Sequence, residues 1–296
     1  MKAGFYEILK TLGKNLGLWV VALFAWLVST GYFLFRPTRV RNSMRFYKAA
    51  FPDRGFPGRL GLTLRQFHHF ATGFVDRLRL AYGKDVEFET EGMEAFFEQT
   101  KTGRGGVIIM SHFGNWEIAA RLLQRQNVRL LLYLGQVAGQ DIETGQKQDI
   151  AKDGVKVVVA DDRGGSPFDL LEGVHFLREG GFVSIAGDRV QTDRQRTVKG
   201  VFFGRRVTVP VAPHLLSRVS GNPVFHLFPI RLGPGRFKVV VRGPVDVHSW
   251  GRMSRDRFIR RSAQEYLNAL ERMVRKHPDH WYHFERFLGE PVITDD

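Results

Sequence analysis

The 296-residue sequence contains no cysteine. This absence excludes a disulfide framework, zinc and iron–sulfur sites with cysteine ligands, and enzymes that use a thiol nucleophile. A serine nucleophile of the α/β-hydrolase type is not indicated either, because no G-x-S-x-G elbow occurs. Gly103, Gly105 and Gly106 precede a strand, but no helix follows where a P-loop or a dinucleotide fingerprint requires one. Any nucleophile that the chemistry requires would therefore have to come from the substrate.

Acidic residues are scarce relative to basic ones. Thirty Asp and Glu stand against 44 Lys and Arg, which gives a net charge of +14. The apolar fraction of 43% and the charged fraction of 25% are those of an ordered chain. The positive surplus indicates an anionic partner, which is nucleic acid, an anionic membrane surface, or an acidic protein or substrate.

An uncharged run of 21 residues lies between Lys14 and Arg36. As a helix it would be roughly 30 Å long, about the thickness of the hydrocarbon core of a bilayer. Trp19 and Tyr32 lie near its ends, where amphipathic rings favour the membrane interface. We expect an N-terminal membrane helix. Two alternatives stay open, which are a buried core helix and a helix that lies in the interface without spanning.

The charges around this run favour a membrane over nucleic acid. Residues 1–50 carry eight basic side chains and one acidic one, so their net charge of +7 is half of the whole surplus. Because more basic residues follow the run than precede it, the positive-inside rule places the chain after residue 36 in the cytoplasm. We expect a membrane anchor with a basic flank over 1–50 and a catalytic domain over 51–296.

Short apolar runs alternate with helical patterns after residue 100. Residues 51–65, rich in Gly and Pro, are expected to form a linker. Apolar runs predict strands at 107–110, 128–134, 155–160 and 182–187, followed by a strand pair at 223–232 and 237–243. Helices are expected at about 115–126, 167–180, 212–221 and 254–276. This pattern predicts an α/β fold with a mostly parallel sheet flanked by helices. Ligands then bind at the carboxyl ends of the strands.

The segment SHFGNWE, residues 111–117, follows the first of these strands. His112 lies at the strand end, Gly114 permits a tight turn, and Asn115 is a favourable N-cap for the next helix. The turn would allow the carboxylate of Glu117 to reach the imidazole of His112 and fix its tautomer, so that the imidazole can take a proton from a substrate hydroxyl. The alternative is a structural histidine, with Glu117 merely favouring the helix N-terminus.

The motif and its sequel resemble a known family. H-x4-[DE] after a buried strand is similar to the signature of glycerolipid-type acyltransferases, and HFGNWE resembles the form found in the late acyltransferases of lipid A biosynthesis. The resemblance continues through GDR at 187–189, VFFG at 201–204, 209–224 and HPDHWYHFERF at 277–287. It covers most of the chain and implies a glycerolipid-acyltransferase-like fold that requires no cofactor.

The resemblance also implies roles for individual residues. His112 would be the general base, Glu117 its orienting carboxylate, and Asp188 with Arg189 would bind or orient a substrate near that pair; Asn115 is counted with these substrate-binding residues. The family usually carries Arg between the first motif and GDR, but 134–148 has none, so Arg163 is the nearest candidate. The form GDR is similar to a neighbouring branch of the superfamily, which leaves the acceptor lipid open.

Two Arg-rich stretches and a histidine cluster give weaker signals. Arg205 and Arg206, in the loop expected at 192–206, are suited to contact a phosphate group, although a solvated basic loop is the alternative. The stretch 252–261 is suited to dock the acidic acyl carrier protein, or is simply a solvated helix face. The spacing of the histidines in 277–283 invites a metal interpretation, but Pro278 and the surrounding aromatics favour a packed segment, and we expect no metal.

Together these features predict a monomeric acyltransferase attached to the bacterial inner membrane, with its active site facing the cytoplasm. The donor would be a fatty acyl thioester on acyl carrier protein or coenzyme A, and the acceptor a hydroxyl of a phosphorylated lipid A precursor. Two other readings remain, which are the same chemistry on another glycolipid, a lipid amine or a polyene, and a non-catalytic basic module attached to a membrane. Nucleic-acid binding is not expected.

Overall fold

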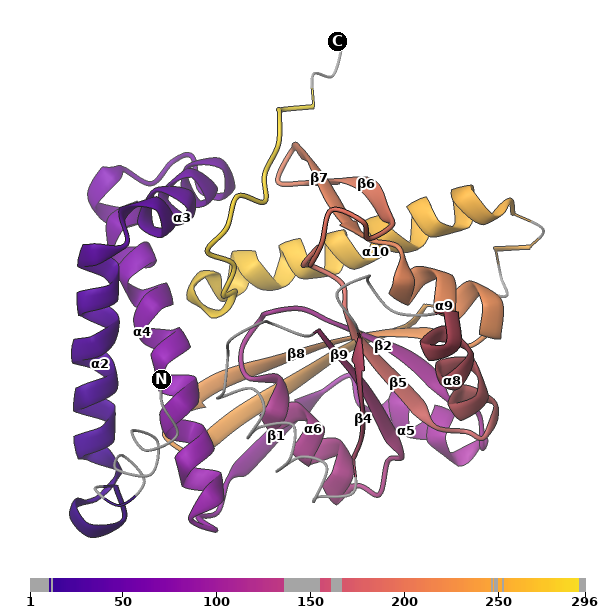
Figure 1. The fold of residues 1–296 in the computed structure, drawn as a ribbon, viewed down its shortest axis with the longest axis horizontal. Helices are drawn as coiled ribbons and strands as arrows, with labels where there is room; N and C mark the ends of the chain where they lie inside the picture. The colour runs from indigo at the N-terminus through magenta and orange to yellow at the C-terminus, as the bar shows by residue number, and fades with distance from the viewer. Residues whose placement is uncertain are drawn as a thin grey trace.

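The computed structural model describes residue 11 and residues 13–135, 155–160, 167–245, 247, 250–251 and 253–292 (Figure 1). The expected fold class is confirmed, because a seven-stranded sheet with one antiparallel pair lies between two layers of helices. In sheet order its strands are β1 (Glu87–Glu91), β9 (Arg236–Val245), β8 (Val224–Gly233), β2 (Gly106–Met110), β5 (Phe182–Ala186), β3 (Leu130–Gly135) and β4 (Lys156–Ala160). The antiparallel pair is β8 with β9, as the strand pair in the sequence predicted.

Both faces of the sheet are buried, which explains why its central strands are apolar throughout. Val107 and Ile109 of β2 face the core formed with α8 (Pro167–Arg178), α9 (Ala212–Ser220) and α10 (Arg255–Lys276). Ile108 and Met110 face the opposite core, formed with α5 (Glu94–Lys101) and α6 (Trp116–Arg125). Alternate residues of a strand point to opposite faces, so a strand covered on both sides must be apolar at every position.

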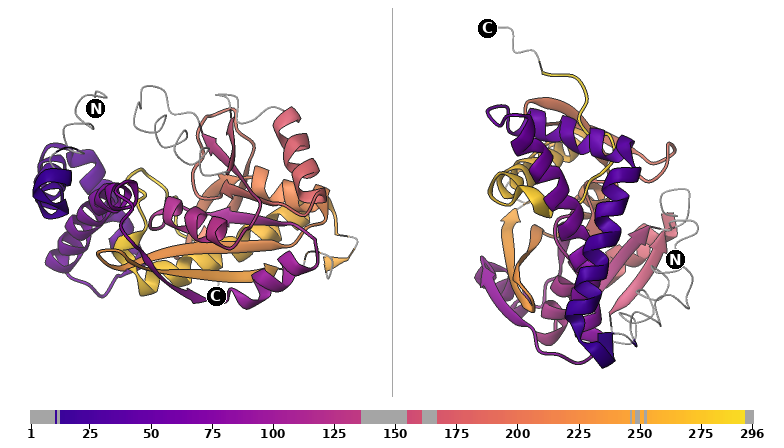
Figure 2. Two further views of the ribbon diagram at one scale, coloured as in Figure 1. Left: turned by 90° about the horizontal axis from the view of Figure 1, so that it is seen from below. Right: turned by 90° about the vertical axis from the view of Figure 1, so that its left-hand side faces the viewer.

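Between residue 18 and the first strand, the described chain forms α2 (Leu18–Phe35), α3 (Pro37–Ala50) and α4 (Phe56–Ala81). The linker expected at 51–65 is therefore wrong beyond residue 55, because α4 begins at Phe56 with Pro57 in its first turn. Proline is well tolerated there, since the first N–H groups of a helix have no intrahelical partner. Figure 2 shows α2 as the outermost element on its side of the molecule, with α4 between it and the sheet. The division of the chain at residue 50 stays a prediction.

The stretch 192–206 is a second departure from expectation. It was expected to be a loop, but residues 197–210 form an antiparallel hairpin of β6 (Thr197–Phe202) and β7 (Arg205–Pro210). The alternation of polar and apolar residues in TVKGVF fits a strand with one buried face. The apolar side of this hairpin, including Phe202 and Val207, joins the core beside α10.

Candidate active site

Strand register brings His112 and Asp188 together at the carboxyl edge of the sheet. β2 and β5 are parallel neighbours, and Met110 is paired with Ala186 at their ends. His112 and Asp188 each follow two residues later, so both side chains emerge at the same level of adjacent strands. This edge is where ligands bind in open α/β sheets.

The carboxylate of Asp188 accepts hydrogen bonds from three N–H groups. One oxygen meets the ring Nδ1 of His112 at 2.8 Å. The other accepts from the backbone N–H of His112 at 2.8 Å and from the indole Nε1 of Trp281 at 2.8 Å. Asp188 is fully buried behind the imidazole, whereas 34% of the His112 side chain is exposed. The ring therefore has its Nδ1 side fixed and can present its other nitrogen to a substrate.

Electrostatics keep Asp188 ionised. Burial on its own raises the pKa of a carboxyl group, but the hydrogen bond and attraction to His112, attraction to His283 and the indole N–H of Trp281 hold the pKa of Asp188 well below its ordinary value. An ionised carboxylate can only accept hydrogen bonds, so Nδ1 of His112 must carry a hydrogen. In the neutral imidazole the nitrogen without a hydrogen is then Nε2, which is the arrangement that a general-base histidine requires.

Glu117 occupies a different place from the one its spacing predicted. Its Oε2 accepts from Nε of Arg77 on α4 at 2.9 Å, and among the described residues its buried Oε1 has no hydrogen-bond partner. The carboxylate on the ring of His112 is instead that of Asp188. The reason lies in the cap: Asn115 accepts from the backbone N–H of Glu117 at 3.1 Å, which fixes Glu117 in the first turn of α6, where its side chain meets α4.

The turn after His112 depends on a glycine and on the C-terminal segment. Gly114 has a φ of +63°, and a Cβ there would lie 1.8 Å from the carbonyl oxygen of Pro229, so no other residue fits without a backbone shift. The N–H of Gly114 donates to the carbonyl of His280 at 2.7 Å, and the N–H of Tyr282 donates to the carbonyl of His112 at 2.7 Å. Residues 280–282 thus hold the turn after His112 from both sides.

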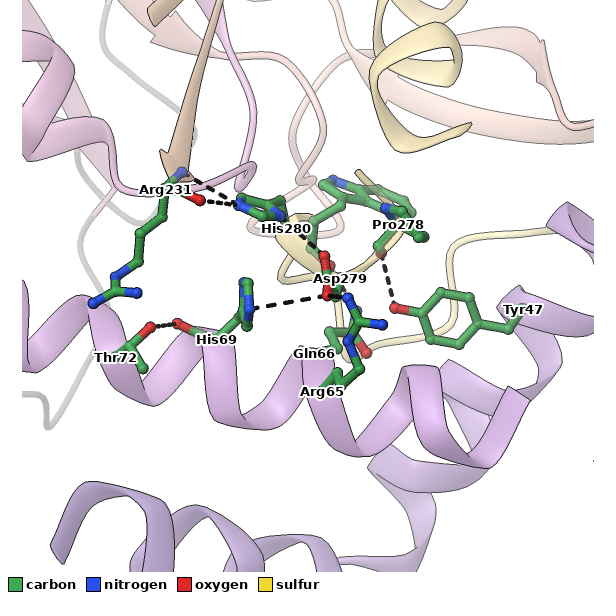
Figure 3. Close-up of polar contacts among 10 residues, drawn as sticks. Tyr47, Arg65, Gln66, His69, Thr72, Arg231, Pro278, Asp279 and His280 are labelled. Carbon is green, nitrogen blue, oxygen red and sulfur yellow. Dashed lines mark hydrogen bonds and ion pairs between the residues drawn. The ribbon is translucent and has the colours of Figure 1, made fainter. Parts of the chain in front are cut away.

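Polar contacts also join residues 278–281 to the helices α3 and α4 (Figure 3). We name residues 278–281 the C-terminal clamp. The contacts are Tyr47 Oη donating to the carbonyl of Pro278 at 2.9 Å, Arg65 Nη2 to Asp279 Oδ2 at 2.6 Å, and Gln66 Nε2 to the carbonyl of Trp281 at 2.6 Å. Since Trp281 also donates to Asp188, the clamp connects α3 and α4 to the pair of His112 and Asp188.

Three residues in and beside the clamp could by distance hold a metal ion. The potential ligand atoms of His69, Asp279 and His280 lie within 4.8 Å of one another. Those of Asp279 and His280 have protein partners: Nδ1 of His280 meets Asp279 at 3.0 Å, its Nε2 accepts from the N–H of Arg231 at 3.2 Å, and Arg65 takes the second oxygen of Asp279. A cation would have to displace these bonds and approach a guanidinium group, so the geometry fits a clamp better than a metal site.

Of the predicted substrate-binding arginines, one lies next to Asp188 in the chain and two lie on β7. Arg189 follows Asp188 directly and reaches Glu285 at 3.9 Å, while its buried Nε has no hydrogen-bond partner among the described residues. Arg205 and Arg206 begin β7, where the backbone of Arg206 pairs with residues 289–290. Within the described ranges neither forms an ion pair or hydrogen bond with His112 or Asp188. Arg163 lies outside the described residues.

Sequence reasoning missed two residues of the site. Trp281 lies in the aromatic segment 277–287, and its indole N–H donates to the buried carboxylate of Asp188. Arg77 was not considered, although it pairs with Glu117. Neither residue has a local signal: each comes from a helix or segment distant in the chain, and only the packing of α4 and the clamp against the sheet brings them here.

The chemistry available to the site is proton removal from a bound nucleophile. A partly exposed imidazole with an ionised carboxylate on its far nitrogen is two thirds of a catalytic triad, and no cysteine exists to complete it. A hydroxyl or amine of a substrate would take the third place.

Comparisons with known proteins agree with this chemistry. Residues 2–288 match the family model of the bacterial lipid A biosynthesis acyltransferases. A search of curated proteins finds no match to the sequence.

Proposed function

The chain belongs to the bacterial lipid A biosynthesis acyltransferase family and is an acyltransferase, and we propose that it uses His112 as the general base and Asp188 as the carboxylate that orients it. The single observation that carries this assignment is the 2.8 Å contact between His112 Nδ1 and a fully buried Asp188, with the imidazole itself partly exposed. Glu117 then has an indirect role, because its ion pair with Arg77 joins the catalytic turn to α4.

The proposed reaction is direct transfer of an acyl group to a substrate hydroxyl. The hydroxyl oxygen attacks the thioester carbonyl while Nε2 of His112 takes its proton, and Asp188 stabilises the imidazolium that forms. Collapse of the tetrahedral intermediate breaks the carbon–sulfur bond, and the imidazolium returns the proton to the departing thiolate. Backbone N–H groups or Arg189, whose Nε has no partner among the described residues, would stabilise the oxyanion.

We propose a lipid A precursor as acceptor and acyl carrier protein or coenzyme A as donor, with the enzyme acting as a monomer on the cytoplasmic face of the bacterial inner membrane. The family is membrane-associated, and one helix near the N-terminus is apolar enough to meet a membrane. The net charge of +14 supports a phosphorylated acceptor, an anionic membrane surface and an acidic carrier protein. The basic stretches around Arg205 and after residue 252 are the candidates for these contacts.

A second acceptor class has some support. GDR at 187–189 resembles a neighbouring branch of the superfamily, and no Arg occurs in 134–148. The alternative is therefore the same chemistry on another glycolipid, a lipid amine or a polyene. Mass spectrometry of lipids from cells with and without the gene separates the two, because loss of one acyl chain from lipid A supports the first, and a change confined to another lipid supports the second.

The mechanism is tested by acyl transfer with the full chain in lipid or detergent. Because general-base catalysis is worth about 10²–10⁴ in rate, His112→Ala should lose at least about 100-fold in activity. His175→Ala is the matched control, since His175 lies on α8 with 77% of its side chain exposed, and it should transfer acyl groups at the wild-type rate. Wild-type transfer by His112→Ala would overturn the mechanism.

A further inference from the structure

The outer face of α2 is apolar and uncovered. The helix has 18 residues and no charged side chain, and its buried residues are Leu18, Val21, Ala25 and Ser29. Its exposed large side chains are Trp19, Leu23, Phe24, Trp26, Leu27, Val28, Tyr32, Leu34 and Phe35. A contiguous apolar surface of this kind marks an interaction site, and its length alone is compatible with a helix that crosses a bilayer.

The inner face of α2 is joined to α4 along its whole length. The contacts run in antiparallel order: Leu18 and Val21 pack with Val75 and Leu78, Trp26 lies 4.9 Å from His68, Thr30 Oγ1 is 2.9 Å from Nε2 of His68, and the rings of Phe33 and Phe67 are 5.5 Å apart. Figure 1 shows the two helices side by side, with the sheet beyond α4. Packed helices have axes about 8–10 Å apart, so α4 must lie wherever α2 lies.

The far side of α4 is unsuited to a hydrocarbon environment. Asp76 pairs with Arg231 at 2.8 Å, and Arg77 pairs with Glu117 at 2.9 Å, so this stretch of α4 is fixed to the catalytic domain by charged groups. If α2 crossed the bilayer, α4 and the catalytic turn behind it would have to lie within the hydrocarbon core as well. A charged side chain at the centre of the bilayer costs about 2.5–3.5 kcal/mol on insertion scales, and open sheet edges are not tolerated anywhere in the hydrocarbon layer.

The charges next to α2 fit a headgroup layer. Arg36, Arg41, Arg45 and Lys48 are exposed, and α3 contains no acidic residue. A cleft of about 330 Å³ opens where α2 meets α3, and its lining includes Phe35, Arg36, Arg39, Phe284 and Glu285. Basic residues near an anionic leaflet contribute about 1 kcal/mol each to binding, and these four follow directly at the C-terminal end of α2.

We propose that α2 does not cross the membrane but lies in the plane of one anionic leaflet, with its exposed face among the acyl chains and α3 at the headgroups. This proposal rests on the membrane attachment assumed in the proposed function, and it makes the enzyme monotopic. The catalytic turn then stands behind α4, and the cleft at the α2–α3 junction opens toward the headgroup layer from which a lipid acceptor would come.

The absence of native cysteine permits a direct test with single-cysteine variants of the full chain. Leu16→Cys and Thr38→Cys place an exposed thiol at the two ends of α2. A membrane-impermeant maleimide is added to intact spheroplasts, and then to lysed ones. An in-plane helix has both ends on one side, so the two variants should label alike, whichever side that is. A spanning helix gives opposite results for the two positions, and this outcome would overturn the proposal.

A second experiment measures how deep α2 lies in the membrane and whether lipid covers its outer face. It uses an environment-sensitive fluorophore on the protein and spin-labelled lipid in anionic vesicles. A probe on Leu27→Cys, in the middle of the outer face, should be quenched most by shallow labels, and the control Val219→Cys on α9 should not be quenched. Strongest quenching of the Leu27→Cys probe by the deepest labels would indicate a spanning helix and contradict in-plane insertion. Absence of quenching, together with sedimentation of the protein as a dimer, would indicate that a second chain covers this face, and this result would also contradict it. Acyl transfer is measured on the same variants, so that a failure of the proposed function is seen separately from a failure of this topology.

Discussion

Replacing Asp188 by asparagine tests the site most sharply, because the change keeps the shape and reverses one hydrogen bond. The carboxylate accepts from His112 N–H and Trp281 Nε1 at one oxygen and from the ring Nδ1 at the other. In D188N the single amide oxygen should stay where two donors converge. The NH₂ group then faces Nδ1, which must accept, so the ring hydrogen moves to Nε2.

The magnitude follows from the tautomer. With Nε2 protonated, His112 cannot take a proton from the acceptor hydroxyl, and the imidazolium loses its ionised partner. The equivalent acid-to-amide change in a serine protease triad lowers kcat by about 10⁴, and general-base catalysis alone is worth about 10²–10⁴. We expect kcat/KM of D188N to fall by about 10³–10⁴, which is about 4–5.5 kcal/mol in the activation free energy.

The assay measures acyl transfer to a lipid acceptor as a function of pH, together with the tautomer of His112 from the nitrogen shifts of labelled protein. E117Q is the control, because Glu117 contacts Arg77 rather than the ring, and its tautomer should be that of the wild type. D188N activity within tenfold of the wild type, or a tautomer that changes in E117Q but not in D188N, would refute the assignment of Asp188 as the orienting residue.

Three further predictions concern stability. Gly114→Ala should lower the free energy of unfolding by at least about 2 kcal/mol, because its φ is positive and a Cβ overlaps a carbonyl oxygen; chemical denaturation measures this, and an unchanged midpoint would contradict it. Arg65→Ala should cost about 1–3 kcal/mol by leaving the buried Asp279 short of a donor, whereas Arg65→Lys should recover part of the loss. Burial lowers the pKa of His214 and of His226 to about 3 in the folded chain, so only the unfolded chain binds their protons between about pH 6.5 and 3, and stability must fall as pH falls through this window. At pH 5 each should cost about 2 kcal/mol, and the loss between pH 7 and pH 5 should be smaller in His226→Gln; an equal loss would exclude this origin.

The fold was predictable where local patterns decide it. Central strands such as β2 are apolar at every position because both faces are buried, and α10 shows one apolar face. The exposed edge strand β1 (EFETE) has no such pattern and was not predicted. The beginning of α4 was taken for a linker because Gly and Pro are common in loops, although Pro57 is also what a helix start tolerates.

The sequence indicated individual residues of the candidate site but not which of them contact one another. Glu117 was expected on His112 because the two share one short segment. Asp188 reaches the ring only because β2 and β5 are neighbours in a register that pairs Met110 with Ala186. Pairing between strands about 75 residues apart is decided by the whole fold, so a local motif indicates the candidate histidine without indicating its partner.

The C-terminal clamp has a consequence for the order of events during synthesis of the chain. The turn that carries His112 is held by residues 280–282, and the orienting carboxylate is held by Trp281. Chains emerge from the ribosome N-terminus first, so α2 can reach the membrane long before these residues are made. A nascent chain that contains α2 but not yet residues 280–282 would lack the contacts that hold His112 and Asp188 in place, so on the proposed mechanism it could not yet transfer an acyl group.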